Sequence, residues 1–526
     1  MTATRAATAA ARRSRSRAPL PLAYAWAAAI AAGAIMPFAF QPFGWWPLIV
    51  PAVGLAIVSL RGRSLGAAFG LGFTTGAIFF LLHIQWITVY LGLVPLVALT
   101  AWMAAWWGLG GMALALAWRW GDPRMQGPLG AFAGMPLLLG AVWTARESLS
   151  SSVPWGGFAW GRLAHSQAAS PLADTTSWVG FSGLTFLLAA VSALLVQLVL
   201  HHRTILRRRL TIGAAALILL VAIPGFPVEA TGSIRVGAVQ GDSEAGLLAP
   251  RVPGQILEQH LEATRGLEGE ELDLLVWPEN AAEWYADETP ATMAALDRVA
   301  ERFDAPLVTG TITRDGDDTY NALIQVEPGR GAVAEYRKRH PVPFAEYLPA
   351  RGFFEPILEA LGFLQYIPRD YSIDPSSANA FEVAGTTAGL AICFDIVDDH
   401  LAREMVLEHG AEIILAPTNN ADFGEGSAEN VQQLAIAQLR AAEAGRALVN
   451  ISTVGTSAII GPDGAEIDRL PQYEPGTMAE ELPLSTTVTP GIRLGAWIDL
   501  ALIIGAALAL AGLGVANRTA ARRPHA

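Results

Sequence analysis

Three side chains of different chemical type stand near the ends of predicted strands: a carboxylate, an ammonium group and the only thiol in the chain. Glu279 follows an apolar run that ends in Trp-Pro, Lys338 follows a Tyr-Arg pair, and Cys393 follows the apolar run Leu-Ala-Ile. Open α/β sheets place their chemistry at strand ends, so residues from different strands can meet there. We therefore treat these three residues as candidates for one site.

The three groups could together carry out nucleophilic catalysis. A thiol needs a base or a nearby cation to become a nucleophile. Glu279 could take a proton and return it to a leaving group, and Lys338 could stabilise a tetrahedral oxyanion by charge and hydrogen bonding. His340 is the rival base, but nothing in the sequence points to the Asp or Asn that would orient it in a Cys–His pair.

Each candidate also has a plain structural interpretation. A lone cysteine is commonly a small buried core residue, an acid after a buried strand can cap a turn, and the basic run around Lys338 could be a solvated surface. Against the first interpretation, a sulfur at a strand-to-helix turn faces a cleft, where a helix N-terminus would lower its pKa. One cysteine also excludes an intramolecular disulfide and a zinc site built from thiolates.

The candidates lie in a region where predicted strands and amphipathic helices alternate. The predicted strands are 234–240, 272–277, 306–312, 320–326, 388–393, 413–416, 447–452 and 456–460, and the predicted helices are 255–267, 291–303, 399–409 and 430–443. This alternation favours an α/β domain with a covered sheet.

The rest of the chain is strongly apolar. The 526 residues are 52% hydrophobic and only 16% charged, whereas soluble proteins average about 25% charged residues. A membrane-spanning helix needs about 20 mostly apolar residues. Eight segments meet this description, at 19–38, 42–60, 65–90, 93–118, 128–145, 174–200, 210–226 and 491–514. The sequence therefore predicts a multi-pass α-helical membrane domain together with the α/β domain.

Arginines mark alternate loops between these spans. They form five groups: Arg5, Arg12, Arg13, Arg15 and Arg17; Arg61 and Arg63; Arg119 and Arg124; Arg203, Arg207, Arg208 and Arg209; and Arg518, Arg522 and Arg523. By the positive-inside rule these loops are cytoplasmic, which places the α/β region outside. A signal peptide is the alternative for the first span. The arginines are better explained by topology than by nucleic-acid binding, so no nucleic-acid partner is expected.

The predicted organisation has five parts. Residues 1–18 form a cytoplasmic basic N-terminus, 19–227 a transmembrane domain of seven helices, 228–489 an extracytoplasmic catalytic domain, 490–514 a final transmembrane helix and 515–526 a cytoplasmic basic tail. The aromatic, glycine-rich loop 154–161 is too polar to span a membrane. It could be an interfacial or re-entrant segment or a simple aromatic belt at the headgroup level.

The order Glu279, Lys338, Cys393 along the chain resembles the Glu-Lys-Cys set of the nitrilase superfamily. With seven spans before the α/β domain and one after it, the resemblance narrows to the apolipoprotein N-acyltransferase family and covers nearly the whole chain. The motifs that carry it are Trp277-Pro278-Glu279, Tyr336-x-Lys338, Val342-Pro343-Phe344-x-Glu346-Tyr347 and Ile392-Cys393, with support from Val239-Gln240-Gly241-Asp242, Tyr320-Asn321, Gly461-Pro462-Asp463-Gly464 and the helix from Gln438 to Glu443.

The resemblance implies an αββα sandwich (a CN-hydrolase domain) on a bacterial plasma membrane. Cys393 would take an acyl chain from a phospholipid as a thioester and pass it to the N-terminal α-amine of an S-diacylglyceryl-cysteine lipoprotein. Glu279 would be general base and acid, and Lys338 would stabilise the oxyanion with the backbone N–H of Phe394. Glu346 would support Lys338 or the amine. Tyr347 and Asp395 are further supporting candidates, the enzyme is expected to be a monomer, and no metal or cofactor is required.

Several positions depart from the family's commoner pattern. Phe394-Asp395 stands where many members have Tyr-Glu, Asp422 where Trp is usual, and Ala345 where Gly precedes the second acid; no Trp occurs in 243–253. The stretch 361–377, with Tyr366, Pro368 and Tyr371, is a candidate lid by composition.

Two other functions remain open at this stage. A membrane-anchored amidase would use the same three residues, although one span would suffice as an anchor. A transporter would need ionisable groups in its spans, and the main candidates are His83 with Gln85 and Asp499. We interpret His83 as a packed or interfacial residue.

Overall fold

The computed structural model describes residues 19–201, 206–243, 246, 252–367 and 370–521. The chain divides into two compact units, one from residues 1–224 with 494–526 and the other from residues 225–493. The predicted basic N-terminus, Arg203, Pro368 and the last two arginines lie outside the described residues.

The first unit is helical. Its helices are α2 (Leu22–Ile35), α3 (Ile49–Ser59), α4 (Leu65–His83), α5 (Ile87–Leu91), α6 (Leu93–Gly121), α7 (Met135–Ser150), α8 (Thr176–Leu200) and α9 (Leu206–Val221), and it also holds most of α15 (Pro490–Ala521). Among the described residues, five helical segments are long and apolar enough to cross a membrane: Leu22–Ala39, Leu65–His83, Leu93–Gly121, Ala173–Leu200 and Pro490–Thr519. The apolar segment Trp46–Ser59 is shorter. Several membrane helices are thus present, and a total of eight stays a prediction.

Two of the predicted spans have different ends in the structure. The predicted helix 65–90 breaks after His83, and α5 follows as a separate short helix. His83 is buried against Phe40 and Phe79, with ring centroids 4.5 and 4.9 Å away, so it is a packed residue. The predicted end of a span at residue 145 is wrong, because α7 continues to Ser150.

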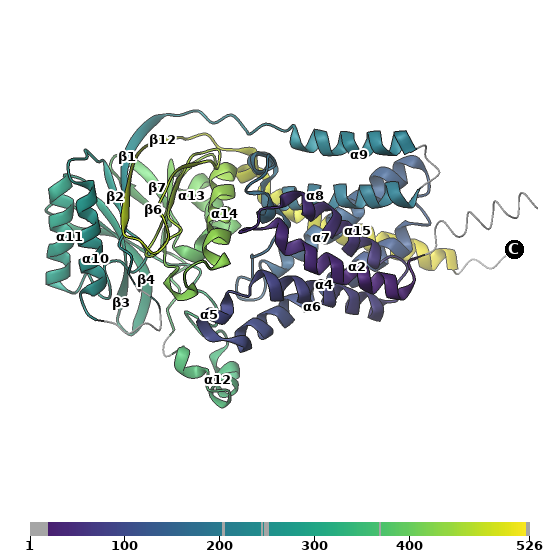
Figure 1. Ribbon diagram of the computed structural model, residues 1–526, viewed down its shortest axis with the longest axis horizontal. Coiled ribbons are helices and arrows are strands. Elements are labelled where there is room, and N and C mark those ends of the chain that lie inside the picture. Colours follow the sequence, from purple (N-terminus) through teal and green to yellow (C-terminus); the bar gives the residue numbers. More distant parts are fainter. Residues whose placement is uncertain (1–18, 202–205, 244–245, 247–251, 368–369, 522–526) are drawn as a thin grey trace, which may run out of the picture. The chain divides into compact units, whose positions relative to one another are not determined.

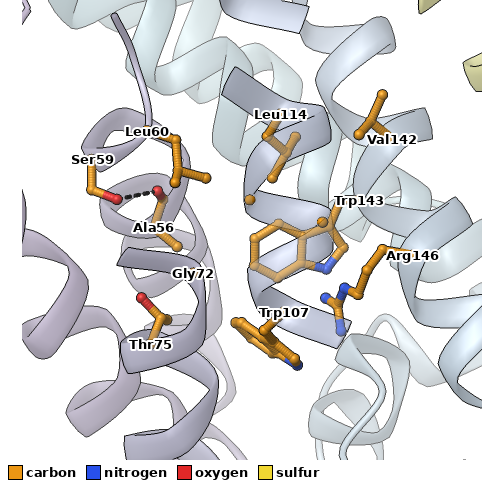
Figure 2. A pocket seen from close by; sticks show the side chains of 12 residues that line it. Ala56, Ser59, Leu60, Gly72, Thr75, Trp107, Leu114, Val142, Trp143 and Arg146 are labelled. Atoms are coloured by element: carbon orange, nitrogen blue, oxygen red, sulfur yellow. Dashed lines mark hydrogen bonds between the residues drawn. The ribbon is translucent and has the colours of Figure 1, made fainter. Parts of the chain in front are cut away.

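Helix α7 continues because its two charged side chains find partners inside the helical unit. The guanidinium of Arg146 lies 4.4 Å from the ring centre of Trp107 and 5.1 Å from that of Trp143, and such cation–π contacts stabilise a desolvated cation. Arg146 borders a cavity of about 20 Å³ between α3, α4, α6 and α7 (Figure 2). Glu147 accepts hydrogen bonds from Thr185 Oγ1 (2.6 Å) and the backbone N–H of Leu163 (3.2 Å).

Polar contacts also join α15 to the helical unit. Asp499 Oδ1 accepts hydrogen bonds from the hydroxyls of Ser148 and, at 2.8 Å, Ser182. The loop around residues 154–161 is divided: Trp155 is exposed, whereas Trp160 is buried and packs edge-on against Trp86. The C-terminal half of this loop is therefore part of the packed interior of the unit.

The second unit is an α/β sandwich with two six-stranded sheets (Figure 1). The first sheet has the order β12-β1-β2-β3-β4-β5 and the second β11-β10-β9-β8-β7-β6. The strands are β1 (Gly232–Gln240), β2 (Leu274–Val276), β3 (Leu307–Asp315), β4 (Asp318–Glu327), β5 (Gly331–Arg337), β6 (Ala380–Val383), β7 (Thr386–Leu390), β8 (Ile413–Thr418), β9 (Ala447–Ser452), β10 (Ala458–Ile460), β11 (Glu466–Arg469) and β12 (Gly476–Leu484). The predicted α/β class is confirmed.

Side chains that alternate between the two faces of each strand form the layers of the α/β unit. In β2, Leu274 and Val276 join the core between the two sheets, whereas Leu275 joins a second core under the outer helices, because successive side chains point to opposite faces of a sheet. Helices α10 (Gln255–Thr264) and α11 (Pro290–Phe303) cover the first sheet, and α13 (Asp399–Leu407) and α14 (Ala428–Ala444) cover the second. This is the αββα arrangement.

The parallel strands β1, β2, β3 and β7, β8, β9 form the centres of the two sheets, with antiparallel strands outside them. The sequence did not predict β5, β6, β11 or β12. Strand β12 is held by pairing with β1, more than two hundred residues away along the chain, and such a partner leaves no local signal.

Candidate active site

Cys393 stands where the chain leaves the second sheet. Strand β7 ends at Leu390, and a 3₁₀ helix, η8 (Cys393–Val397), begins at the thiol residue. Cys393 has φ +50°, a conformation that non-glycine residues rarely adopt and that clusters at functional sites. The side chain packs against the core between the sheets but remains partly exposed. The predicted strand 388–393 therefore extends three residues too far, and Cys393 lies at the edge of the core in a turn.

Asp395 braces the turn that presents Cys393. Its Oδ2 accepts hydrogen bonds from the hydroxyl of Tyr336 (2.8 Å) and the backbone N–H of Ile392 (3.1 Å). Its Oδ1 accepts a hydrogen bond from the backbone N–H of His340 (3.0 Å). Burial raises the pKa of Asp395, and the nearby Lys338 opposes this effect. Asp395 thus links the segment after β5 to the turn after β7.

Glu279 follows β2 and is held by contact with β3. The N–H of Trp277 donates to Val308 O (2.9 Å), and the N–H of Gly310 donates to Pro278 O (3.0 Å). A Cβ at Gly310 would lie 2.5 Å from both Glu279 Cα and Asn280 N. Residue 310 therefore has to be a glycine, because any side chain there would displace the backbone of Glu279.

If Cys393 forms an acyl-enzyme, as the family resemblance implies, we expect Gly310→Ala to move Glu279 and to lower the rate of that step at least about tenfold, because small misplacements of catalytic groups are costly. The measurement is single-turnover acylation of the purified protein. Gly232→Ala is the matched control, since its Cβ would meet only Leu484 Cδ1 at 3.9 Å. Equal acylation rates for the two variants would contradict the predicted role of Gly310.

Lys338 follows β5 and is fully enclosed. Its N–H donates to Asn321 O (2.7 Å), and its Nζ lies 2.9 Å from Glu346 Oε2 and 3.4 Å from Glu279 Oε1. Only 2% of the residue is exposed, so a solvated basic run is the wrong interpretation for Lys338. Its neighbours Arg337 and Arg339 do form ion pairs nearer the surface.

Asn321 joins the two carboxylates and was not selected as a site residue from the sequence. Its Nδ2 donates to Glu279 Oε1 (2.6 Å) and to Glu346 Oε1 (3.0 Å). Glu346 Oε2 also accepts the N–H of Val342 (2.6 Å). The motif Tyr320-Asn321 marked the position, but only the side-chain contacts of the folded domain show that its amide reaches both acids.

The electrostatics of this cluster differ from the sequence-based expectation. Burial raises the pKa of Glu279, with an opposing effect from Lys338. Burial disfavours the charged form of Lys338, but the carboxylates of Glu279 and Glu346 hold its pKa well above the ordinary value. Burial and the charge of Glu279 together raise the pKa of Cys393 to about 12, despite Lys338. The direction is opposite to the lowered thiol pKa expected from the sequence, and it favours a neutral thiol that needs a base.

We expect the alkylation of Cys393 by iodoacetamide to rise about tenfold per pH unit from pH 7 to pH 10 without reaching a plateau. Only the thiolate reacts, and a thiol with a pKa of about 12 is still mostly protonated at pH 10. The single cysteine makes intact mass a direct readout. A plateau below pH 8 would show instead a thiolate stabilised at rest.

The other residues proposed from the sequence are His340, Tyr347 and Phe394. His340 Nδ1 lies 3.1 Å from Asp398 Oδ2, so an orienting acid exists, contrary to the sequence-based argument. In the described part of the chain, His340 makes no hydrogen bond to Cys393. Tyr347 is half-buried, and burial together with Asp370 raises its pKa. Phe394 is the second residue of η8, and an oxyanion-binding role for its N–H stays a prediction.

Part of the candidate lid, residues 361–377, contacts the segment that carries Glu346. Tyr366 lies in a short 3₁₀ helix, and buried Tyr371 donates its N–H to Glu346 O (2.8 Å). The loop that carries Asp422 forms a 3₁₀ turn at Ala421–Phe423, four residues before α14. Among the described residues, no cluster of three or more His, Cys, Asp or Glu has the arrangement of a metal site.

Comparison with known proteins gives two family matches that follow each other along the chain. Residues 32–194 match the apolipoprotein N-acyltransferase N-terminal domain, and residues 235–489 match the carbon-nitrogen hydrolase domain. A protein named apolipoprotein N-acyltransferase from Azotobacter vinelandii is 30% identical, over 94% of this chain and 95% of its own length. This chain belongs to the apolipoprotein N-acyltransferase family.

Other members of the apolipoprotein N-acyltransferase family match over similar lengths. The protein of that name from Pseudomonas aeruginosa PAO1 is 30% identical, over 94% of this chain and 97% of its own length. The one from Mycolicibacterium smegmatis is 28% identical, over 91% of this chain and 83% of its own length. Among solved structures, an amidase of the nitrilase superfamily from Nesterenkonia covers 49% of this chain and 94% of its own, with a TM-score of 0.37 and 18% identity.

Proposed function

We propose that this protein transfers an acyl chain from a phospholipid to the N-terminal α-amine of S-diacylglyceryl-cysteine in lipoproteins, through a thioester on Cys393. The observation that carries the proposal is the family relationship over both parts of the chain, the helical part and the α/β part together. An amidase anchored to the membrane would need only the second part and a single span. The cluster of Glu279, Lys338 and Cys393 supports the same chemistry.

In the first half-reaction, the sulfur of Cys393 bonds to the acyl carbonyl carbon of the phospholipid. Glu279 takes the thiol proton, and the oxyanion of the tetrahedral intermediate is stabilised by Lys338. The ester C–O bond then breaks, and Glu279 gives the proton to the departing lysophospholipid oxygen. Because burial and the charge of Glu279 favour the protonated thiol, a base beside it is required for this step.

In the second half-reaction, the α-amine of the lipoprotein bonds to the thioester carbonyl carbon. Glu279 takes a proton from the attacking amine, the C–S bond breaks, and the proton passes to the sulfur of Cys393. The products are an amide and the free thiol. Glu346 holds Lys338 between two carboxylates and so keeps it charged through both half-reactions.

Both substrates would be lipids, and this explains a membrane-embedded acyltransferase. Extracting an acyl chain into water costs about 0.8 kcal/mol per CH₂ group. A reaction at the membrane surface avoids that cost. We further propose the membrane topology that the arginines indicate, with both termini cytoplasmic and the catalytic domain outside the plasma membrane. In this topology residues 19–227 form the transmembrane domain, 228–489 the catalytic domain and 490–514 the final transmembrane helix.

The test of the activity is incubation of the purified protein with a phospholipid that carries a labelled acyl chain. We expect an acyl adduct that hydroxylamine removes, present in the wild type and absent in Cys393→Ala. A diacylglyceryl-cysteine peptide should then remove the label and become N-acylated. Hydrolysis of small amides without any lipid-derived adduct would favour the amidase instead.

A labelling experiment tests the topology separately. A cysteine placed at Asp317, in the exposed turn between β3 and β4, can be introduced into the Cys393→Ala background. A membrane-impermeant maleimide should label it in intact spheroplasts. Labelling only after membrane disruption would place the catalytic domain inside the cell.

A further inference from the structure

Gln433 is a polar residue beside Cys393 that the reaction scheme above does not use. It lies in the second turn of α14 and is buried. Its side-chain nitrogen lies 3.7 Å from Cys393 Sγ and 3.1 Å from Thr418 Oγ1. Its side-chain oxygen accepts a hydrogen bond from Asn420 Nδ2 (2.7 Å).

The surrounding hydrogen bonds determine which end of this amide faces the sulfur. Asn420 Nδ2 also donates to Glu429 Oε2 (2.8 Å), and Asn420 Oδ1 accepts the hydroxyl of Ser452 (2.8 Å). An ionised Glu429 carboxylate can only accept hydrogen bonds, so in that state the nitrogen of Asn420 faces Glu429. Its second N–H then points to the oxygen of Gln433, which leaves the NH₂ group of Gln433 for the sulfur.

Glu429 anchors this chain of amides in the interior. It is buried at the N-terminal end of α14, and burial raises its pKa to about 8, although its hydrogen bond with Asn420 works in the opposite direction. The order from the anchor to the nucleophile is Glu429, Asn420, Gln433, Cys393. These residues come from α14, from the loop after β8 and from the turn after β7, and are brought together only by the fold.

We propose that Gln433 is a further catalytic residue, which donates a hydrogen bond to the sulfur of Cys393 whenever the sulfur carries negative charge. Such charge develops when Glu279 removes the thiol proton and again when the C–S bond of the thioester breaks. Asn420 and Glu429 are positioning residues that keep the amide in the donating orientation. The inference rests on the proposed function for its catalytic part, whereas the contact with the sulfur can be measured without lipid.

The experiment compares Gln433→Met with Gln438→Met in the full-length detergent-purified protein. Gln438 is on the same helix, but its side chain reaches Glu466 near the surface (3.1 Å). Hydrogen bonds to charged groups are worth more than neutral ones. We therefore expect Gln433→Met to lower the iodoacetamide alkylation rate of Cys393 at pH 8 about tenfold, with a parallel fall in both half-reactions. Gln438→Met should behave like the wild type.

A second variant tests the orientation without changing Gln433. Asn420→Asp replaces the donor with an acceptor, so the NH₂ group of Gln433 should turn toward residue 420 and away from the sulfur. We expect alkylation to slow by a similar factor, and thermal unfolding of each variant shows whether the fold is intact. The inference is overturned if folded Gln433→Met alkylates and acylates at wild-type rates, or if Asn420→Asp alone leaves the alkylation rate unchanged.

These measurements separate the inference from the proposed function. If the wild type forms no lipid-derived adduct, the proposed acyl transfer fails, and with it the catalytic role. Slow alkylation in Gln433→Met would then still establish the donor to the sulfur. If the wild type forms the adduct and Gln433→Met forms it equally fast, acyl transfer stands and the role of Gln433 is rejected.

Discussion

Replacing Glu279 by glutamine is expected to slow acyl-enzyme formation about 100- to 10,000-fold, the usual range for a lost general base, and at the same time to speed alkylation of Cys393. The two effects have opposite signs because Glu279 does two things. It accepts the thiol proton during the reaction, and its negative charge raises the pKa of the resting thiol. Glutamine keeps the shape but removes both the charge and the basicity, so the thiol becomes more acidic and the reaction loses its base.

The measurements are single-turnover acylation with labelled phospholipid and the alkylation rate at pH 8. Glu288→Gln is the matched control, because Glu288 lies beyond the same turn in an exposed ion pair with Arg314, and such pairs contribute little. Slower alkylation in Glu279→Gln would show that the charge of Glu279 does not act on the sulfur. Undiminished acylation would show that another group is the base.

Replacing Lys338 by methionine is expected to lower acyl-enzyme formation about 100- to 1,000-fold, as is typical for the loss of one oxyanion donor. Here alkylation of Cys393 should slow rather than speed up, because the ammonium group lowers the thiol pKa. The variant also leaves Glu279 and Glu346 facing each other in a buried site without their shared cation. Breaking a buried pair in this way typically costs about 3–5 kcal/mol of stability.

A double variant separates the loss of stability from the loss of catalysis. Lys338→Met with Glu346→Gln removes one of the two carboxylates, so it should recover part of the lost thermal stability without recovering acylation. Arg337→Met is the control for the neighbouring position, since its ion pairs lie nearer the surface. Recovery of acylation in the double variant would mean that Lys338 only balances charge, and would end its assignment to the oxyanion.

Much of the fold and of the site could be predicted from local patterns. The apolar segments, the arginine groups between them and the alternating strands of the α/β region are properties of short windows of sequence. The types of Glu279, Lys338 and Cys393 and the short motifs around them could be read in the same way, and strand ends in such sheets converge; strand β5, which Lys338 follows, was not predicted, and the catalytic roles stay predictions. The family resemblance used the same motifs, and the family relationship is confirmed.

What required the tertiary structure was every property that depends on partners far away in the chain. Separate strands bring Lys338 between Glu279 and Glu346 and let Asn321 reach both acids. The raised pKa of Cys393 results first from its desolvation in the packed domain and then from the charge of Glu279. The same holds for the contact of Arg146 on α7 with Trp107 on α6. Local sequence determines which groups are available and which elements carry them, whereas desolvation and charge pairing depend on distances and burial that exist only after the elements have packed.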